Sequence, residues 1–325
     1  MATPLRFALL DHIEAPRERP SGEVYEEVAG YVRLADALGF DYYWFSEHHR
    51  YVHYGHLPWP MLFALHLASQ TKQIQLGTAI ICLNLHHPLA IAEQAAVADL
   101  LMQGRLAPGF GSGSSPTESV LFGKALVSEQ ERHAHFAEAL TQILESWNDP
   151  ETLPQAHPTL PARSWQAVNS IGSAQNAGRL GMNMMYSHLR TPEQYKQYRQ
   201  AYRDSGGTGR IAANRPVYVG SDDATAMAEL EPALRALWRR FRSEGKIPAE
   251  TTEPDNPWLL CGHPINFLVG GPESVAEQIA ALRAATDFDV INLEPNWAGL
   301  TSEQICGTIQ RLAEQVRPAL GTIES

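Results

Sequence analysis

The sequence has 325 residues, of which 44% are hydrophobic and only 19% are charged, so it encodes a folded protein with a sizeable core. Its formal net charge of −11 and the lack of a basic stripe exclude a nucleic-acid partner. The three cysteines are odd in number and far apart, which favours a reducing compartment. Because neither a signal peptide nor a bilayer-length apolar run is visible, we expect a cytoplasmic protein with no membrane partner.

Strand-like and helix-like segments alternate through the first half of the chain. A short apolar run over 5–10 predicts a buried strand, and apolar residues at helical spacing over 24–38 predict a helix that ends at Gly39. Further strands are predicted over 42–45, over 74–81 and from 104 into the glycine-rich run that ends at 113. The remaining predicted helices of this half cover 61–69, 90–101 and 131–147.

The second half continues the alternation less clearly. Strands are predicted over 165–168, 182–186, 211–219 and 290–293, and helices over 172–180, 193–204, 224–241, 274–285 and 303–316. The polar, proline-bearing segment 242–265 is interpreted as a long excursion from one domain that spans residues 1–325. Eight strands alternating with helices predict an α/β fold that closes into a (β/α)₈ TIM barrel with insertion segments. A doubly wound open sheet is the alternative, although the strand count fits it less well.

Ionisable residues follow the second and third predicted strands. The aromatic strand over 42–45 runs into Glu47, His48 and His49, and the third strand is followed by His86 and His87. The carboxyl ends of buried parallel strands are where a barrel carries its chemistry. We expect one histidine of the first pair to face the barrel axis and the other to turn away, with Glu47 orienting a histidine ring or a backbone turn. The alternative is that His48 only fills a polar layer of the barrel mouth.

A metal site is the other interpretation of the first histidine cluster, since neutral imidazoles bind zinc. The residues concerned are His48, His49, His53 and His56. Their spacing matches no standard zinc pattern and no cysteine cluster accompanies them, so we expect no metal. The aromatic residues among them, Tyr51, Tyr54 and Trp59, favour a loop that stacks over a planar ligand, with an ordinary exposed loop as the alternative.

The segment 40–88, with its strand, Glu47-His48-His49 run, helix, strand and second histidine pair, resembles the luciferase-like flavin monooxygenases, the superfamily of bacterial luciferase. The resemblance extends over most of the chain. It implies an FMN-dependent monooxygenase that receives reduced FMN from a separate flavin reductase and uses dioxygen to oxygenate an organic substrate. It also implies that His48 is the general acid/base near the flavin, a role that suits the near-neutral pKa of an imidazole.

The resemblance further implies where the flavin lies. The pair Ala79-Ile80 matches a strand end that lies flat against the flavin ring, often at a bulge or a non-proline cis peptide. The segment 169–173 precedes a helix, and helix starts bind anions such as the flavin phosphate, although simple N-capping by Ser170 is the alternative. The full set of predicted cofactor-binding residues is Ala79, Ile80, Gly111, Ser112, Arg132, Asn169, Ser170 and Ser173.

Two positions depart from the family pattern. Many relatives carry an arginine after the fourth strand, in a run like GxGRG, where this chain has Ser112. Asn169 stands where luciferase has a glutamate, which removes a negative charge near the proposed phosphate. The phosphate would therefore depend on Arg132, the helix start and backbone N–H groups.

The substrate and partners are expectations of the same kind. Apolar and aromatic residues expected in the pocket suggest a small, largely apolar substrate, namely Phe7, Trp44, Phe45 and Tyr186. The excursion 242–265 matches a mobile lid of related enzymes, and Trp258, Leu259 and Leu260 favour its docking against an apolar surface. We expect a homodimer, because relatives often pair through helices on one side of the barrel.

Two other functions stay open. The first is a deazaflavin-dependent oxidoreductase, a sister branch of the same superfamily. The second is a non-catalytic flavin-binding partner subunit, like the regulatory chain of luciferase, and the intact Glu47-His48-His49 run argues against it.

Overall fold

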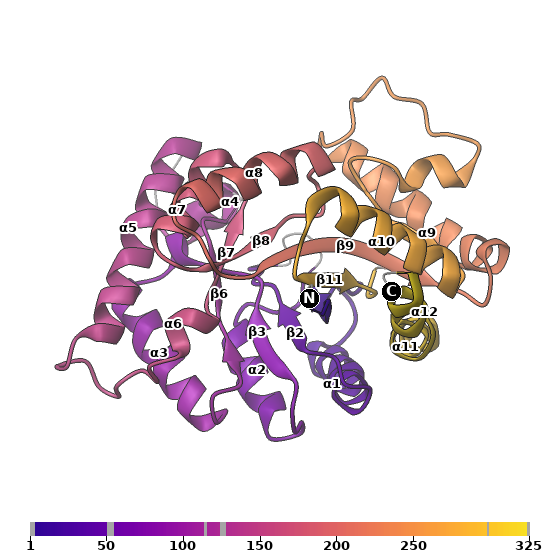
Figure 1. Ribbon diagram of the computed structural model, residues 1–325. Coiled ribbons are helices and arrows are strands. Elements are labelled where there is room, and N and C mark those ends of the chain that lie inside the picture. Colours follow the sequence, from indigo (N-terminus) through magenta and orange to yellow (C-terminus); the bar gives the residue numbers. More distant parts are fainter. Residues whose placement is uncertain (1–3, 51–54, 114–115, 124–127, 298, 324–325) are drawn as a thin grey trace.

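Parallel strands form a closed ring in the computed structural model, which describes residues 4–50, 55–113, 116–123, 128–297 and 299–323 (Figure 1). The ring consists, in chain order, of β1 (Arg6–Asp11), β2 (Tyr42–Phe45), β3 (Gln75–Thr78) with β4 (Ile81–Cys82), β5 (Leu106–Ala107) with β6 (Gly109–Gly111), β7 (Trp165–Val168), β8 (Asn183–Tyr186), β9 (Ile211–Val219) and β11 (Val290–Glu294). Because β1 pairs with both β2 and β11, while β3 pairs with β5 and β4 with β6, the ring has no open edge. The predicted barrel is confirmed and the open sheet is excluded. The short β10 (Leu268–Gly270) pairs with β9 outside the ring.

Helices cover the outside of this ring (Figure 1). They are α1 (Ser21–Ala37), α2 (Pro60–Ala68), α3 (Pro88–Leu101), α4 (Pro116–Leu121), α5 (Glu129–Asn148), α6 (Leu160–Arg163), α7 (Ile171–Arg179), α8 (Pro192–Asp204), α9 (Asp223–Ser243), α10 (Pro272–Thr286), α11 (Ser302–Arg311) and α12 (Arg317–Ile323). Several begin one or two residues before the predicted start, at a proline whose fixed φ suits the first helical turn, as in α3 and α10. In the described part of the chain, no helix combines the length and the apolar character needed to cross a membrane.

The third and fourth barrel strands are each broken in the middle. β3 ends at Thr78, and β4 resumes after the pair Ala79-Ile80, whose peptide bond is cis. The hydroxyl of Thr78 donates to the carbonyl of Gly109 and accepts from its N–H, both at 2.9 Å. A Cβ atom on Gly109 would lie 2.1 Å from the Thr78 carbonyl oxygen, so only glycine fits there. The single strand predicted over 74–81 is therefore two segments.

The alternation of side chains along each strand separates two cores. Inside the barrel, Trp44 stacks on Tyr42 at 5.0 Å and meets Trp165 edge-on. The outer core between the strands and the helices contains Phe7, Phe45 and Tyr186. These three side chains point away from the barrel axis, and Trp44 is fully buried among other core residues. The prediction that these four residues line the substrate pocket is therefore wrong.

The excursion after α9 packs on its own small core beside the barrel, where Figure 1 shows it in orange. Leu260 is buried in this core together with Ile265 and Phe267. Trp258 and Leu259 are exposed, at 42% and 66%, so the expected docking holds for Leu260 alone. Glu253 ties the segment to α9 by ion pairs with Arg235 and Arg239, at 2.9 and 2.8 Å.

Candidate active site

The buried carboxylate of Glu47 organises one side of the barrel mouth. Its Oε1 accepts hydrogen bonds from the Nε2 atoms of His49 and His86, both at 2.8 Å. Its Oε2 accepts from the backbone N–H of Cys82 at 3.1 Å, which fixes the end of β4. The prediction that Glu47 orients a histidine ring or a backbone turn is confirmed for the ring, and the backbone group that it binds belongs to strand β4. Burial raises the pKa of Glu47, but the hydrogen bonds from His49 and His86 outweigh it, so the pKa is lowered and the group is ionised.

The same three side chains are the set that comes closest to a metal site among the described residues. Each imidazole nitrogen lies 2.8 Å from one shared oxygen, which is the geometry of N–H···O hydrogen bonds. The histidines of the zinc alternative are dispersed instead. His56 lies near Ser21 and the carbonyl of Ala15, and His53 falls outside the described residues. Hydrogen bonding therefore accounts for the Glu47 cluster.

His48 faces a different neighbourhood from His49. Its ring centroid lies 5.9 Å from that of His12, which follows β1. The chain passes close to His48 again at Gly55, where a Cβ atom would lie 2.8 Å from the Cβ of His48. Gly55 also forms a β-bridge with Glu14. The two adjacent histidines therefore contact different groups, and that one of them faces the barrel axis stays a prediction. His48 is half-buried and His49 is buried, so His48 is the one that a ligand at the mouth can reach.

A second cluster of ionisable residues, His12, His188 and Glu294, was not predicted. Glu294 ends β11, two residues beyond Asn292 and four beyond Val290, which lies in the inner core, so alternation turns its side chain inward. His188 Nδ1 lies 3.3 Å from the carboxylate of Glu294, and His12 Nε2 lies 3.7 Å from it. Each residue lies at or just beyond the carboxyl end of a strand, and that position is the signal by which sequence reasoning could have found the cluster.

Opposite charges stabilise one another in this buried cluster. Burial raises the pKa of Glu294, but the imidazoles of His188 and His12 outweigh it and lower the pKa to about 2. Burial lowers the pKa of His12, but the carboxylates of Glu294, Glu14 and Asp11 outweigh it, and the pKa is raised. Glu294 is therefore ionised near neutral pH, and His12 keeps its proton to a higher pH than a free imidazole.

Trp297 and α9 close the space around the second cluster. The indole ring lies 6.2 Å from His12 and 6.0 Å from His188, and its N–H donates to the carbonyl of Glu294 at 2.7 Å. Arg240 of α9 reaches Glu14 at 2.9 Å, across 226 residues of sequence. These contacts fasten the added helix to the mouth of the barrel.

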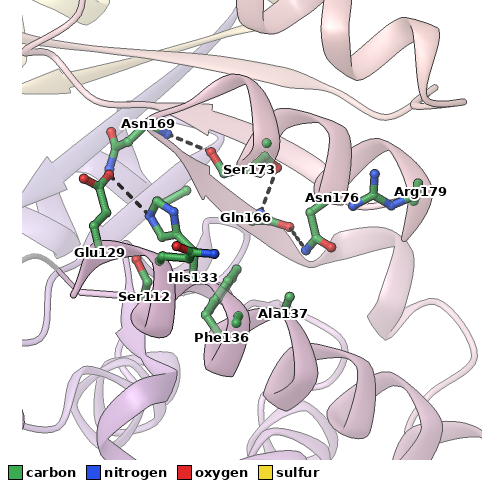
Figure 2. A pocket seen from close by; sticks show the side chains of 14 residues that line it. Ser112, Glu129, His133, Phe136, Ala137, Gln166, Asn169, Ser173, Asn176 and Arg179 are labelled. Atoms are coloured by element: carbon green, nitrogen blue, oxygen red, sulfur yellow. Dashed lines mark hydrogen bonds and ion pairs between the residues drawn. The ribbon is translucent and has the colours of Figure 1, made fainter. Parts of the chain in front are cut away.

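A cavity of about 620 Å³ opens between α5 and α7 (Figure 2). Three of its lining residues, Ser112, Asn169 and Ser173, are predicted cofactor ligands. Its other polar lining residues include His133, Gln166, Asn176 and Arg179, which the sequence analysis missed. Figure 2 places Ser112 and His133 at one end and Arg179 at the other. Arg132 and Ser170 are not among the lining residues of this cavity in the described structure, although each adjoins one in sequence.

The helix start at the cavity is a capping box. Ser170 Oγ accepts from the N–H of Ser173 at 3.2 Å, and Ser173 Oγ accepts from the N–H groups of Asn169 and Ser170 at 3.1 and 3.0 Å. Ser170 is thus the N-cap of α7, as the alternative interpretation has it. An anion here would exchange these internal bonds for its own, or would use Gly172 and the lining side chains.

The pair predicted to contact the flavin ring, Ala79-Ile80, forms the break between β3 and β4. Ala79 and Ile80 are half-buried and joined by the cis peptide that the family pattern anticipates. β4 pairs with β6, and a Cβ atom on Gly111 would lie 2.9 Å from the Ile80 side chain. Ser112 follows Gly111 and lines the cavity, whereas Ala79, Ile80 and Gly111 are not among its lining residues. A Cβ atom on Gly111 would lie 3.4 Å from the Cβ of Ala167, which does line it, so the strand end adjoins the cavity.

Comparison with known proteins adds an independent observation. The sequence profile of the family described as luciferase-like monooxygenase matches residues 5–287. The oxygenase component of the flavin-dependent trigonelline monooxygenase of Acinetobacter baylyi is 23% identical over 97% of this chain and 95% of its own length. Monooxygenase RslO1 from Streptomyces bottropensis shares the fold, with a TM-score of 0.83 at 24% identity over 97% of this chain and 99% of its own.

A solved structure with a bound flavin has the same fold. The oxygenating constituent of the 3,6-diketocamphane monooxygenase from Pseudomonas putida, in complex with FMN, gives a TM-score of 0.76 at 19% identity over 98% of both chains. Proteins that depend on coenzyme F420 are also among the similar ones.

Proposed function

The chain belongs to the luciferase-like monooxygenase family, and from this premise we propose that it is the oxygenase of a two-component system. It takes reduced FMN from a separate flavin reductase and uses dioxygen to insert one oxygen atom into a small organic substrate. The observation that carries the proposal is that Gly111 adjoins both the Ile80 side chain and Ala167, a residue that lines the cavity together with Ser112, Asn169 and Ser173. The oxygenase-component relative supports the separate reductase.

The residues present fit FMN. The half-buried backbone at Ala79-Ile80 offers a planar peptide group to a ring, and the cavity has the volume of a small-molecule pocket. Hydroxyl and amide groups of Ser112, Asn169 and Ser173 suit a phosphate, and Arg132 would add charge beside it. Bound reduced FMN would supply the reaction with dioxygen, while the chain binds the cofactor, holds protons and excludes water.

Two parts of the chain would complete this site. His48 would be the acid/base group, because it is the half-buried histidine of the mouth and faces His12 rather than Glu47. The segment 242–265 would be the lid of the one-domain barrel, since α9 reaches the mouth through Arg240 and Glu14. Protection of this segment from limited proteolysis on flavin binding would support the lid.

The direct test is an anaerobic titration of the protein with reduced FMN, followed by oxygen uptake in wild type and His48→Ala. We expect binding in both proteins and a much lower yield of oxygenated product in the variant. Equal rates of oxygen uptake and equal product yields would favour the non-catalytic partner subunit. Absence of binding would end the proposal.

A deazaflavin-dependent oxidoreductase is the second candidate, because F420-dependent proteins are among the similar ones and Ser112 replaces the expected arginine. Reconstitution with each cofactor separates the two functions. Tight binding of F420 without affinity for reduced FMN would decide for this candidate.

We further propose a homodimer that forms through α2 and α3. Large apolar side chains are exposed on these helices, namely Leu62, Leu89, Val97, Leu100 and Leu101. Sedimentation should give a dimer for wild type and a monomer for the double variant Leu62→Glu with Leu101→Glu.

The three unpaired cysteines suit a cytoplasmic location.

A further inference from the structure

The Glu294–His188 pair has the arrangement of a carboxylate–imidazole dyad. The carboxylate lies against Nδ1 of the imidazole at 3.3 Å, and the other ring nitrogen, Nε2, is buried without a hydrogen-bond partner among the described residues. In such dyads the carboxylate orients the ring and stabilises its charged form, which leaves Nε2 to exchange a proton with a bound molecule. A buried polar atom without a partner is costly, so it indicates a ligand that supplies one.

We propose that His188 is a second acid/base group at the barrel mouth, held by Glu294 as its positioning residue, and that the organic substrate presents a hydroxyl or N–H group to its Nε2. This inference rests on the proposed function, because it names the chemistry of the substrate that the oxygenase receives. It replaces the expectation of a largely apolar substrate, whose supporting residues lie in the cores of the protein.

The surroundings of His188 fix its ring in place. Its carbonyl accepts from Nδ2 of Asn266, the residue after the excursion, at 2.6 Å, so both its backbone and its Nδ1 are anchored. The ring of Trp297 stands nearly perpendicular to it, and Phe241 of α9 lies parallel at 6.4 Å. Aromatic walls beside a single polar nitrogen suit a ring or chain that carries one hydrogen-bond donor.

The proton transfer balances without a further reactant. The substrate O–H or N–H bond breaks, a new N–H bond forms at Nε2, and the Nδ1 proton stays against Glu294. The positive charge of the resulting imidazolium is compensated by the ionised carboxylate. His12, on the other side of Glu294, stands between this dyad and His48, at 3.7 Å from the carboxylate and 5.9 Å from the His48 ring.

NMR of protein labelled with ¹⁵N-histidine tests the proposal, with phenol and toluene as probes of the same shape with and without a donor. The His188 resonances are assigned by their loss in His188→Gln. We expect Nδ1 to carry the proton in the free protein, and phenol to shift the Nε2 resonance while toluene does not. We expect Glu294→Gln to weaken the phenol effect roughly tenfold, because the neutral amide oxygen can still accept from Nδ1 but no longer compensates a positive charge on the ring. His157→Gln, at an exposed histidine, is the control and should leave the response unchanged.

Other outcomes overturn the inference. It fails if Nε2 carries the proton, if phenol leaves Nε2 unshifted, or if toluene shifts it equally. Should Glu294→Gln not fold, the tautomer and the two probes still decide the matter in the wild-type protein. Binding of reduced FMN, measured separately, should be the same in wild type and His188→Gln. A wild type that responds to phenol but does not bind FMN would contradict the proposed function and leave this donor site standing.

Discussion

The two sides of the barrel mouth each carry a buried carboxylate between two histidines, but they are built differently. On the Glu47 side, both imidazoles donate at 2.8 Å and the second oxygen accepts from the backbone of Cys82. On the Glu294 side, the contacts to His188 and His12 are 3.3 and 3.7 Å, and His188 Nε2 has no hydrogen-bond partner in the described structure.

This difference shows how to tell a polar cluster that supports the backbone from one that takes part in chemistry. A fully paired network holds backbone in place and offers nothing to a ligand. A loosely paired network keeps an atom for a bound molecule, at some cost in stability. The same carboxylate and imidazole groups therefore serve different purposes according to how completely they are satisfied.

The largest expected effect separates the two adjacent histidines. His48→Ala should reduce the rate of substrate oxygenation by roughly 10²–10⁴-fold, the usual contribution of an acid/base group, and leave the unfolding free energy nearly unchanged. His49→Ala should instead lower the unfolding free energy, because it leaves the Glu47 carboxylate short of a donor. Steady-state rates and urea denaturation of both variants are the measurements. Equal losses of oxygenation rate in the two variants would contradict the assignment of catalysis to His48 and of stability to His49.

Glu47→Ala should be the most destabilising change at the mouth. It leaves two buried imidazoles and the Cys82 N–H without their acceptor, which costs about 3–5 kcal/mol of unfolding free energy. Urea denaturation measures it, with Glu93→Ala on the exposed face of α3 as the control. A loss no larger than that of the control would mean that the network does not hold the strand end.

Acid titration should reveal the Glu294 side. Its pKa in the folded protein is about 2, below the ordinary 4.5, so the carboxylate stabilises the folded state fully above pH 4.5 and loses this contribution as the pH falls towards 2. At the full pKa shift, the Glu294 carboxylate contributes roughly 3 kcal/mol to the free energy of unfolding. Urea denaturation between pH 6 and pH 3 should show a smaller decline for Glu294→Gln than for wild type. Parallel declines would show that this carboxylate is not paired in the folded state.

The smallest expected effect concerns His12. Its Nδ1 lies 2.7 Å from Ser46 Oγ, and Ser46→Ala removes this one hydrogen bond at a cost of about 0.5–1.5 kcal/mol. Thermal denaturation measures the cost, and ¹⁵N-histidine NMR should show His12 altered and His49 unchanged. A response at His49 would mean that the two sides of the mouth are coupled.

The sequence by itself determined the order of the elements and the first ionisable run. Apolar periodicity, prolines at the first helical positions and glycines at helix ends act locally, so the barrel followed from them with errors of a few residues. Glu47, His48 and His49 were found because they are adjacent and follow one strand.

Only the tertiary structure decided which distant residues meet. His12, His188 and Glu294 come from three strand ends and are brought together by closure of the ring through β1 and β11. Phe7, Phe45 and Tyr186 look equally apolar in either core, and only the register of their strands turns them outward. The pairing of Ser170 with Ser173, rather than with an anion, depends on the local helix start and on what fills the cavity. Contacts of this kind depend on packing and register, which short-range patterns do not encode.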